Sequence, residues 1–449
     1  MEWDEASERA EAVVAGAQTI ISACGGRAAG SEAETTAQRM LLAQMRALPH
    51  ATDAHEEPFR VAPHAFMAFE PVLAVCGVLA VACFWARAPA AAWALAHLGL
   101  AAAVLELGLY REFLDPLFPT RVSRNVLVRI PPANASGSSR VQRRIIVGGH
   151  ADSAYEWRIN PHPAVLWLAH FAQVGAALVV AATTYAPGLR SRALLAVHGA
   201  CAACLLTALL NTAFGRAVPG ASDNLSGALA TLELARHFAQ DSARLAHTEL
   251  VALVTGAEEA GLRGAKAFAR THAAELVGAG VETLFLGLET LAEPAALAVA
   301  HRELNGFVRC DTRAVDLVCR AARDVRTTPL PRQAVYCGAT DAAALAQLGV
   351  AAVTLEGMSP GPANYYHTRR DTVERMSPAC IRDALLVASR AVQLFDAHGL
   401  AVPPDADDAD AVLLASPLHA EFAPAVVVPG KASAKGHEEE GACGVLVEM

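Results

Sequence analysis

Two long apolar stretches divide this 449-residue sequence and limit how the rest of it can fold. The first runs from Phe66 to Tyr110 and is interrupted at Trp85–Pro89. The second consists of Ala164–Ala186 and Ala193–Phe214, joined by residues 187–192. Each half is long enough to cross a hydrocarbon core, which takes ~20 helical residues. Since each stretch predicts a hairpin of two helices, both return the chain to the side it left, and all other segments can meet in one domain.

These stretches also contain ionisable and amide side chains. Such groups are costly in lipid unless they face the interior of a helix bundle, so we expect them to line the inside of four membrane spans. The alternative is a soluble helical subdomain that covers the rest of the fold. The residues concerned are Glu70, His97, Glu106, His170, Gln173, His198 and Asn211.

Outside the apolar stretches, paired carboxylates follow a short apolar run. Leu250–Val254 predicts a buried strand, and Glu258 and Glu259 come just after it, before a Gly-rich turn into a helical pattern. Open α/β sheets place their ligand sites at the carboxyl ends of such strands. A Glu-Glu pair alone is more often a solvated surface feature, so its significance depends on the other motifs.

Four further motifs place polar side chains at the end of a predicted strand or in a loop before a helix. Arg144–Gly149 predicts a strand that ends in a Gly pair followed by His150 and Asp152, and Leu284–Leu288 predicts another that ends at Glu289. Asp223 lies where a loop meets a helical run, and His367 lies in a polar loop ahead of a helix. Each motif alone has a structural explanation, as a core histidine, a helix cap or a strand-end acid. The candidate residues are Asp152, Glu258, His150, Asp223, Glu259, Glu289 and His367.

Taken together and in this order, the motifs resemble those of the M28 family of zinc-dependent exopeptidases, which includes secreted bacterial aminopeptidases and the glutamate carboxypeptidase II group. The resemblance covers roughly Gly25–Arg60, Asn125–Ser153 and Gly220–Leu394. It implies an α/β fold of three layers around a mixed sheet, into which the four hydrophobic helices are inserted.

The resemblance also implies two zinc ions per chain and a role for each ligand. His150 and Asp223 look like ligands, with Asp223 as the carboxylate that bridges both ions. Glu259 resembles the ligand that pairs with His367 on one ion, and Glu289 stands where the family places the acid that joins His150 on the other. The family commonly has Asp at the position of Glu289, so this ligand departs from the usual pattern.

The same resemblance assigns the proton chemistry. Glu258 matches the general base, and Asp152 matches the acid that supports the histidine ligand. The family often has a second acid just before the bridging one, whereas this chain has Ser222. Independently of the family, a neutral imidazole is a common zinc ligand, and a carboxylate two residues away can fix its tautomer.

The insertions imply a discontinuous domain arrangement. We expect a catalytic domain from residues 1–62, 113–162 and 216–402, hydrophobic hairpins at 63–112 and 163–215, and a disordered tail at 403–449.

The expected function is that of a di-zinc exopeptidase acting on a peptide substrate, most simply an aminopeptidase. A single-zinc acyltransferase like glutaminyl cyclase, a carboxypeptidase served by Arg332, Arg369 or Arg370, and a non-catalytic scaffold are the alternatives. A net charge of −9 argues against a nucleic-acid partner. The oligomeric state is not readable from the sequence.

The expected location is a membrane that the chain crosses several times. Arginines flank the predicted spans on the side of the catalytic domain, and no cleavable signal peptide is visible, which favours a cytoplasmic catalytic domain. The hairpin tips also carry arginine, which opposes that orientation. The flanking residues are Arg60, Arg111, Arg121, Arg158 and Arg216, and the tips carry Arg87, Arg190 and Arg192.

Overall fold

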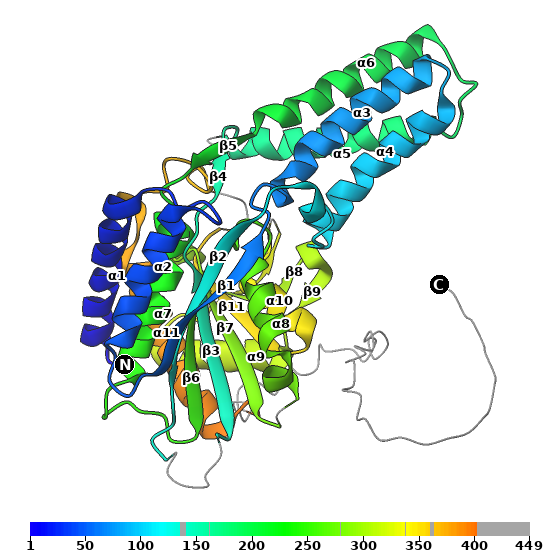
Figure 1. Cartoon of the computed structure of the whole chain (residues 1–449). Coiled ribbons are helices and arrows are strands. Elements are labelled where there is room, and N and C mark those ends of the chain that lie inside the picture. Colours follow the sequence, from blue (N-terminus) through cyan, green and yellow to red (C-terminus); the bar gives the residue numbers. More distant parts are fainter. Residues whose placement is uncertain (135–140, 161, 279, 337, 360–362, 402–449) are drawn as a thin grey trace, which may run out of the picture. The chain divides into compact units, whose positions relative to one another are not determined.

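A nine-stranded mixed sheet organises the described part of the chain (Figure 1). The computed structural model describes residues 1–134, 141–160, 162–278, 280–336, 338–359 and 363–401, so the expected tail at 403–449 lies outside it. The strands stand in the order β1-β2-β6-β3-β7-β11-β8-β10, and β9 pairs with β8. Their bounds are β1 (Thr52–Val61), β2 (Arg121–Ile130), β3 (Arg143–His150), β6 (Thr248–Thr255), β7 (Glu282–Glu289), β8 (Ala298–Glu303), β9 (Val308–Arg309), β10 (Arg332–Val335) and β11 (Ala351–Glu356).

The middle of this sheet is parallel. β3 pairs in parallel with β6 on one side and β7 on the other, and β7 pairs in parallel with β11. In this register His150 is opposite Thr255, and Glu289 is opposite Glu356. The carboxyl ends of these strands therefore meet at one edge of the sheet, as the strand-end motifs predicted.

Helices cover both faces of the sheet. Alternate residues of the central strands point to opposite sides, so Val147 packs with helices of one layer and Ile146 with helices of the other. This is the mixed three-layer α/β fold that the resemblance implied. One layer contains α1 (Trp3–Cys24), α2 (Glu32–Arg46), α7 (Ser226–Phe238), α9 (Thr312–Val325) and α11 (Pro378–His398), and the other contains α8 (Arg263–Val277) and α10 (Asp341–Leu348).

The two apolar stretches form helical hairpins, as predicted. They consist of α3 (Phe69–Trp85) with α4 (Pro89–Ala103), and of α5 (Pro163–Thr183) with α6 (Arg192–Leu206) (Figure 1). Within the part of the chain that the structure describes, four segments are long and apolar enough to cross a membrane, judged by length and composition. These segments are Phe66–Trp85, Pro89–Gly108, Ala164–Thr183 and Arg192–Leu210.

The second hairpin ends earlier than the sequence predicted. Helical structure stops at Leu210, and Phe214, expected in the last helix, lies in strand β5 (Thr212–Ala217). β5 pairs with the short strand β4 (Tyr155–Trp157), which precedes the hairpin. The pairing of β5 with β4 thus outweighs the apolar composition from which a helix was predicted.

Both hairpins are inserted between strands that pair with each other. β1 and β2, which enclose the first hairpin, are antiparallel neighbours, and so are β4 and β5, which enclose the second. The connection between two neighbouring antiparallel strands begins and ends at the same end of the strand pair. A long insertion there leaves the rest of the sheet undisturbed.

Most of the polar groups in the apolar stretches face inward. Five of the seven named above are buried, whereas His97 and His170 are partly exposed. Glu70 accepts hydrogen bonds from the Asn211 side-chain amide and the Thr212 hydroxyl, both at 2.9 Å. His198 accepts one from the Trp85 indole at 3.0 Å. Glu70, Gln173, His198 and Asn211 are thus buried among the inserted helices as predicted, whereas Glu106 is buried against Arg263 of α8, 3.3 Å away.

Glycine allows the strand ends to approach α7 very closely. A Cβ on Gly227 would lie 2.1 Å from the Leu288 carbonyl oxygen and 2.5 Å from the Asn224 side-chain oxygen. A Cβ on Gly149 would lie 2.6 Å from the carbonyl carbon of Gly227. These contacts involve backbone that cannot move aside, so α7 can reach the ends of β3 and β7 only with glycine at both positions.

We predict that Gly227→Ala lowers the unfolding temperature by roughly 5 °C or more, because the added methyl group must displace backbone. Gly199→Ala is the control, since Gly199 lies within α6 and its Cβ would contact nothing within 4 Å. That change should be neutral or slightly stabilising. Thermal unfolding of both variants measures the difference, and equal unfolding temperatures would contradict the close packing.

Candidate active site

All seven candidate residues come together at the carboxyl edge of the sheet. His150 and Glu289 end β3 and β7, and Glu258 and Glu259 form the turn after β6. Asp223 lies in the irregular segment just before α7, followed by a cis peptide bond, and does not cap that helix. The loop that carries His367 completes the cluster.

Asp223 lies at the centre of the cluster and faces both histidines. Its Oδ1 is 3.3 Å from His150 Nε2, and its Oδ2 is 3.1 Å from His367 Nε2. Glu289 Oε1 is 3.6 Å from the same nitrogen of His150, and Glu259 Oε2 is 3.2 Å from the same nitrogen of His367. Asp223 is thus shared by two groups of three potential metal ligands.

These two groups fit zinc. Ligand atoms about 2.0–2.1 Å from a tetrahedral ion lie roughly 3.3 Å from one another, close to the distances given above. Among the described residues, Oε1 of Glu259 and both ring nitrogens of His367 are buried without a hydrogen bond. A buried polar atom without a partner is costly, and a bound cation would satisfy these atoms.

Glu258 lies beside the two groups. Its Oε2 is 3.7 Å from His150 Nε2, and it forms a third potential ligand group with His150 and Glu259. Burial raises its pKa well above the usual range, and the negative charges of Asp341 and Glu289 add to this effect, which His150 opposes. Without a cation, this carboxyl therefore holds a proton more readily than a solvated one.

The other acids respond to the same environment. Burial raises the pKa of Glu259 well above its usual range and also raises that of Glu289. Burial acts on Asp223 in the same direction, but the close imidazoles of His150 and His367 outweigh it and hold its pKa below the usual value. Asp223 therefore stays ionised more readily than Glu258, Glu259 or Glu289. A permanent negative charge suits an oxygen donor shared by two cations.

Comparison with known proteins identifies the family. The sequence model of peptidase family M28 matches residues 125–392, more than half of the chain. The chain belongs to peptidase family M28. It is therefore a zinc metallopeptidase, as the motifs predicted. No curated protein matches the sequence.

Solved structures are similar to this M28 peptidase. An aminopeptidase from Aneurinibacillus sp. strain AM-1 is 17% identical with a TM-score of 0.53, and the match covers 90% of this chain and 98% of that one. A Bacillus subtilis zinc aminopeptidase is 14% identical, with a TM-score of 0.49 and coverage of 86% and 94%. Porphyromonas gingivalis glutaminyl cyclase is 12% identical, with a TM-score of 0.48 and coverage of 87% and 98%.

Two buried aspartates fix the backbone of the M28 site. Asp152 accepts hydrogen bonds from the backbone N–H groups of Glu258 and Glu259, at 3.0 and 3.1 Å, while its Oδ1 lies 3.5 Å from His150 Nδ1. Asp371 accepts from the N–H groups of Ser222 and Asp223, at 2.9 and 3.0 Å. Sequence reasoning gave Asp371 no role, although its position four residues after His367 could have drawn attention to it.

A buried arginine, also not predicted, joins the loops of the site. The Arg27 guanidinium donates to the carbonyl oxygens of Ala151 and Pro219, both at 2.6 Å, and of Gly220 at 2.8 Å. Arg27 is fully buried, and burial lowers its pKa. It therefore fixes the loop after His150 relative to the loop before Asp223.

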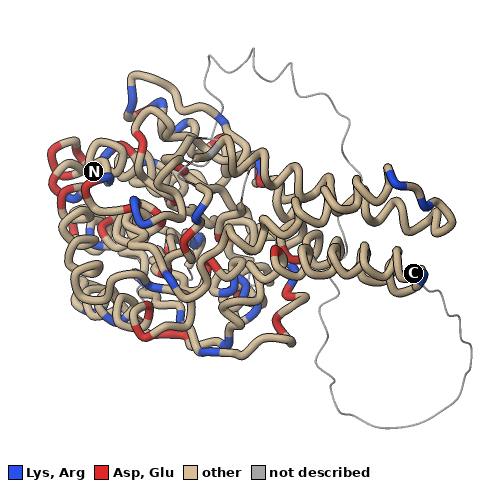
Figure 2. The backbone as a smooth tube through the Cα atoms, turned by 90° about the horizontal axis from the view of Figure 1, so that it is seen from above, with Lys and Arg blue, Asp and Glu red and all other residues tan. Residues whose placement is uncertain are grey.

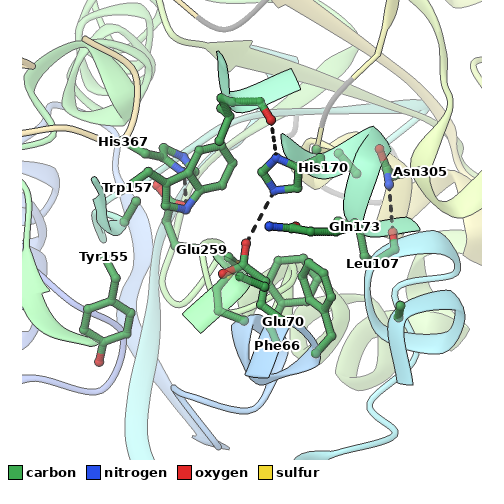
Figure 3. A pocket seen from close by; sticks show the side chains of 18 of the residues that line it. Phe66, Glu70, Leu107, Tyr155, Trp157, His170, Gln173, Glu259, Asn305 and His367 are labelled. Atoms are coloured by element: carbon green, nitrogen blue, oxygen red, sulfur yellow. Dashed lines mark hydrogen bonds and ion pairs between the residues drawn. The ribbon is translucent and has the colours of Figure 1, made fainter. Parts of the chain in front are cut away.

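A cavity of about 310 Å³ opens beside the cluster (Figure 3). Glu258, Glu259 and His367 line one end of it, and side chains from α3, α4 and α5 line much of the rest. Trp157 of β4 also lines it and orders the loop that carries His367: its backbone N–H donates to the His367 carbonyl oxygen at 2.7 Å, and the two rings meet edge to face. The family's site is therefore walled partly by the inserted helices.

We predict that Asp371→Asn weakens zinc binding by roughly 10–100-fold, because the amide presents a donor to one of two backbone N–H groups. Asp396→Asn is a matched control. Asp396 accepts from the N–H groups of Ala246 and His247, both at 2.8 Å, in the same manner but away from the site. Zinc affinity, measured by competition with a chelator, should fall only for Asp371→Asn.

Proposed function

We propose that this chain is a di-zinc aminopeptidase held in a membrane by its four inserted helices. The observation that carries the di-zinc proposal is the position of Asp223, whose two oxygens face His150 and His367 separately. A bridging acid is needed only for a pair of ions. We assign His150 and Glu289 to one ion and His367 and Glu259 to the other.

In such a site, bound zinc lowers the pKa of water, polarises the scissile carbonyl and stabilises the oxyanion. Glu258 borders both the cluster and the cavity, so it can take the proton of the attacking water and return it to the leaving amine. Asp152 keeps Glu258 in place through the backbone N–H and orients the ring of His150.

The charges around the cavity favour a substrate with a free amine. Glu70, Glu258 and Glu259 are among the described residues that line it, and none of those residues is Lys or Arg. Two of the three arginines considered for a carboxypeptidase are engaged elsewhere: Arg369 pairs with Glu156 at 2.6 Å, and Arg332 pairs with Asp316 at 2.6 Å. The third, Arg370, is exposed and does not line the cavity. A cationic terminus is thus favoured over a terminal carboxylate.

Exposed apolar side chains support membrane insertion. Between 17% and 50% of each candidate span is buried by the rest of the chain, and large apolar residues point outward from all four. Figure 2 shows Lys, Arg, Asp and Glu along the catalytic part and few of them along the hairpins, except near the tips. So much exposed apolar surface is unusual for a soluble lid. The outward-facing residues are Val75, Leu79, Trp93, Leu98, Val104, Val165, Leu168, Leu178, Leu195, Val197, Leu206 and Leu210.

We predict two zinc ions per chain in fully active protein. Metal analysis by mass spectrometry on purified protein, with activity measured on the same sample, tests the number. One ion at full activity would overturn the di-zinc assignment and favour the alternative of a single-zinc acyltransferase that cyclises N-terminal glutamine.

We predict that Glu258→Gln keeps both zinc ions but slows peptide hydrolysis by ~10²–10⁴-fold, since the amide cannot accept the proton. Glu259→Gln should lower zinc content first. Both variants are compared for metal content and for turnover of aminoacyl and carboxyl-blocked dipeptides. If Glu258→Gln loses zinc and Glu259→Gln does not, the roles of this pair are reversed.

We predict that the protein sediments with membranes and requires detergent for release, because the outer faces of the hairpins are apolar. A compact monomer in the supernatant without detergent would mean that the four helices form a soluble lid. Arg87→Cys and Arg190→Cys then test the orientation by labelling in intact cells. We favour tips on the non-cytoplasmic side and a cytoplasmic catalytic domain.

A further inference from the structure

The inserted helices contribute more than half of the residues that line the cavity next to the metal cluster. Phe69 and Leu73 come from α3, and Leu107 from the π-helical turn that follows α4. These three residues lie outside residues 125–392, the part that matches the family. This wall of the pocket is therefore a property of this chain's own insertions.

One face of α5 continues the wall into the bundle. The residues that contribute recur every three to four positions, so they share one side of the helix: Leu166, Trp167, His170, Phe171, Gln173 and Val174. From Leu166 to Val174 this face extends about 12 Å along the helix, at 1.5 Å per residue. The cavity therefore reaches from the metal cluster into the bundle.

The bundle wall is mainly apolar, and its few polar groups are already engaged. Glu70 is hydrogen-bonded to Asn211 and Thr212, and His170 Nε2 lies 3.5 Å from it (Figure 3). The Gln173 amide donates to the Thr207 hydroxyl at 3.0 Å. An apolar group entering this part of the cavity would displace water without breaking these contacts.

From this arrangement we propose that the helix bundle forms the specificity pocket of the enzyme and selects peptides whose first residue is large and apolar, such as Phe or Leu. The proposal rests on the proposed aminopeptidase function. The free amine and scissile carbonyl lie at the end lined by Glu258, Glu259 and His367, and the first side chain lies against Phe69, Leu107 and the pocket face of α5. A small first side chain leaves this apolar wall uncovered. A charged first side chain places its charge against the wall, which is costly.

Substrate preference of the intact protein in detergent tests the proposal. We expect kcat/KM for a Phe-initiated substrate to exceed that for an Ala-initiated one by on the order of 10²-fold, because a larger apolar side chain is buried. Equal or better hydrolysis of Ala- or Glu-initiated substrates would overturn the proposal while leaving the aminopeptidase function intact.

Paired variants on α4 and the turn after it locate the preference. Ala103→Leu adds bulk at a pocket-lining position and should lower kcat/KM for the Phe substrate by on the order of tenfold, with little change for the Ala substrate. Ala101→Leu, at a half-buried position on the same helix that does not line the cavity, is the control. Leu107→Ala and Leu100→Ala form a second pair in which the pocket is enlarged instead. If members of each pair behave alike, the bundle does not select the substrate.

Binding gives a readout that does not depend on turnover. Calorimetry should show tighter binding of L-phenylalaninol than of L-alaninol, which contain no amide bond to hydrolyse, and Ala103→Leu should remove the difference. Selective binding without hydrolysis of any aminoacyl substrate would contradict the aminopeptidase function but retain the apolar pocket. Hydrolysis without selective binding would contradict the pocket alone.

Discussion

The structure depends on holding several carboxylates close together out of water. Asp152, Asp223, Glu258, Glu259 and Glu289 surround two imidazoles at the edge of the sheet. Burial and mutual repulsion oppose the ionisation of such groups, and leaving a buried charge unpaired costs several kcal/mol. Backbone N–H groups directed at Asp152 and Asp371 offset part of this cost, and bound zinc would offset more of it. The parallel strand ends and the tight glycine contacts follow from this requirement, because they bring the acids within reach.

The inserted helices are compatible with this arrangement because of where they leave the sheet. Each hairpin lengthens a connection between antiparallel strands, so neither alters the register of β3, β6 or β7. The hairpins and the catalytic domain still meet through specific contacts. Arg263, at the start of α8, is buried and bonds to Glu106 of the first hairpin at 3.3 Å and to Asp115 at 2.6 Å. The turn that carries Glu258 and Glu259 thus leads directly into a contact with the bundle.

Much of the catalytic edge was predictable, because it is encoded locally. Apolar runs ended by glycine and acid placed β3, β6 and β7, and the length of the apolar stretches gave both hairpins. The roles of Asp371 and Arg27 were not predictable, since each depends on backbone groups far away in sequence. Strand β8 was also missed: its first three residues continue an Ala-rich apolar run without strand-like alternation, and His301 and Arg302 follow. The role of Phe69 and Leu107 in the pocket wall was not predicted, because they lie in apolar segments whose composition indicates only a membrane span.

The position of β6 has a consequence for the order in which the protein is made. β2 and β3 are consecutive strands of the main sheet in sequence, yet β6 lies between them and pairs with both. The ribosome completes β6 only after both helical hairpins have emerged. β2 and β3 therefore cannot pair with β6 until the helices have been synthesised, and the acids that follow β6 and end β7 are synthesised later still. A growing chain thus has no assembled metal-binding edge while its hairpins are still being placed.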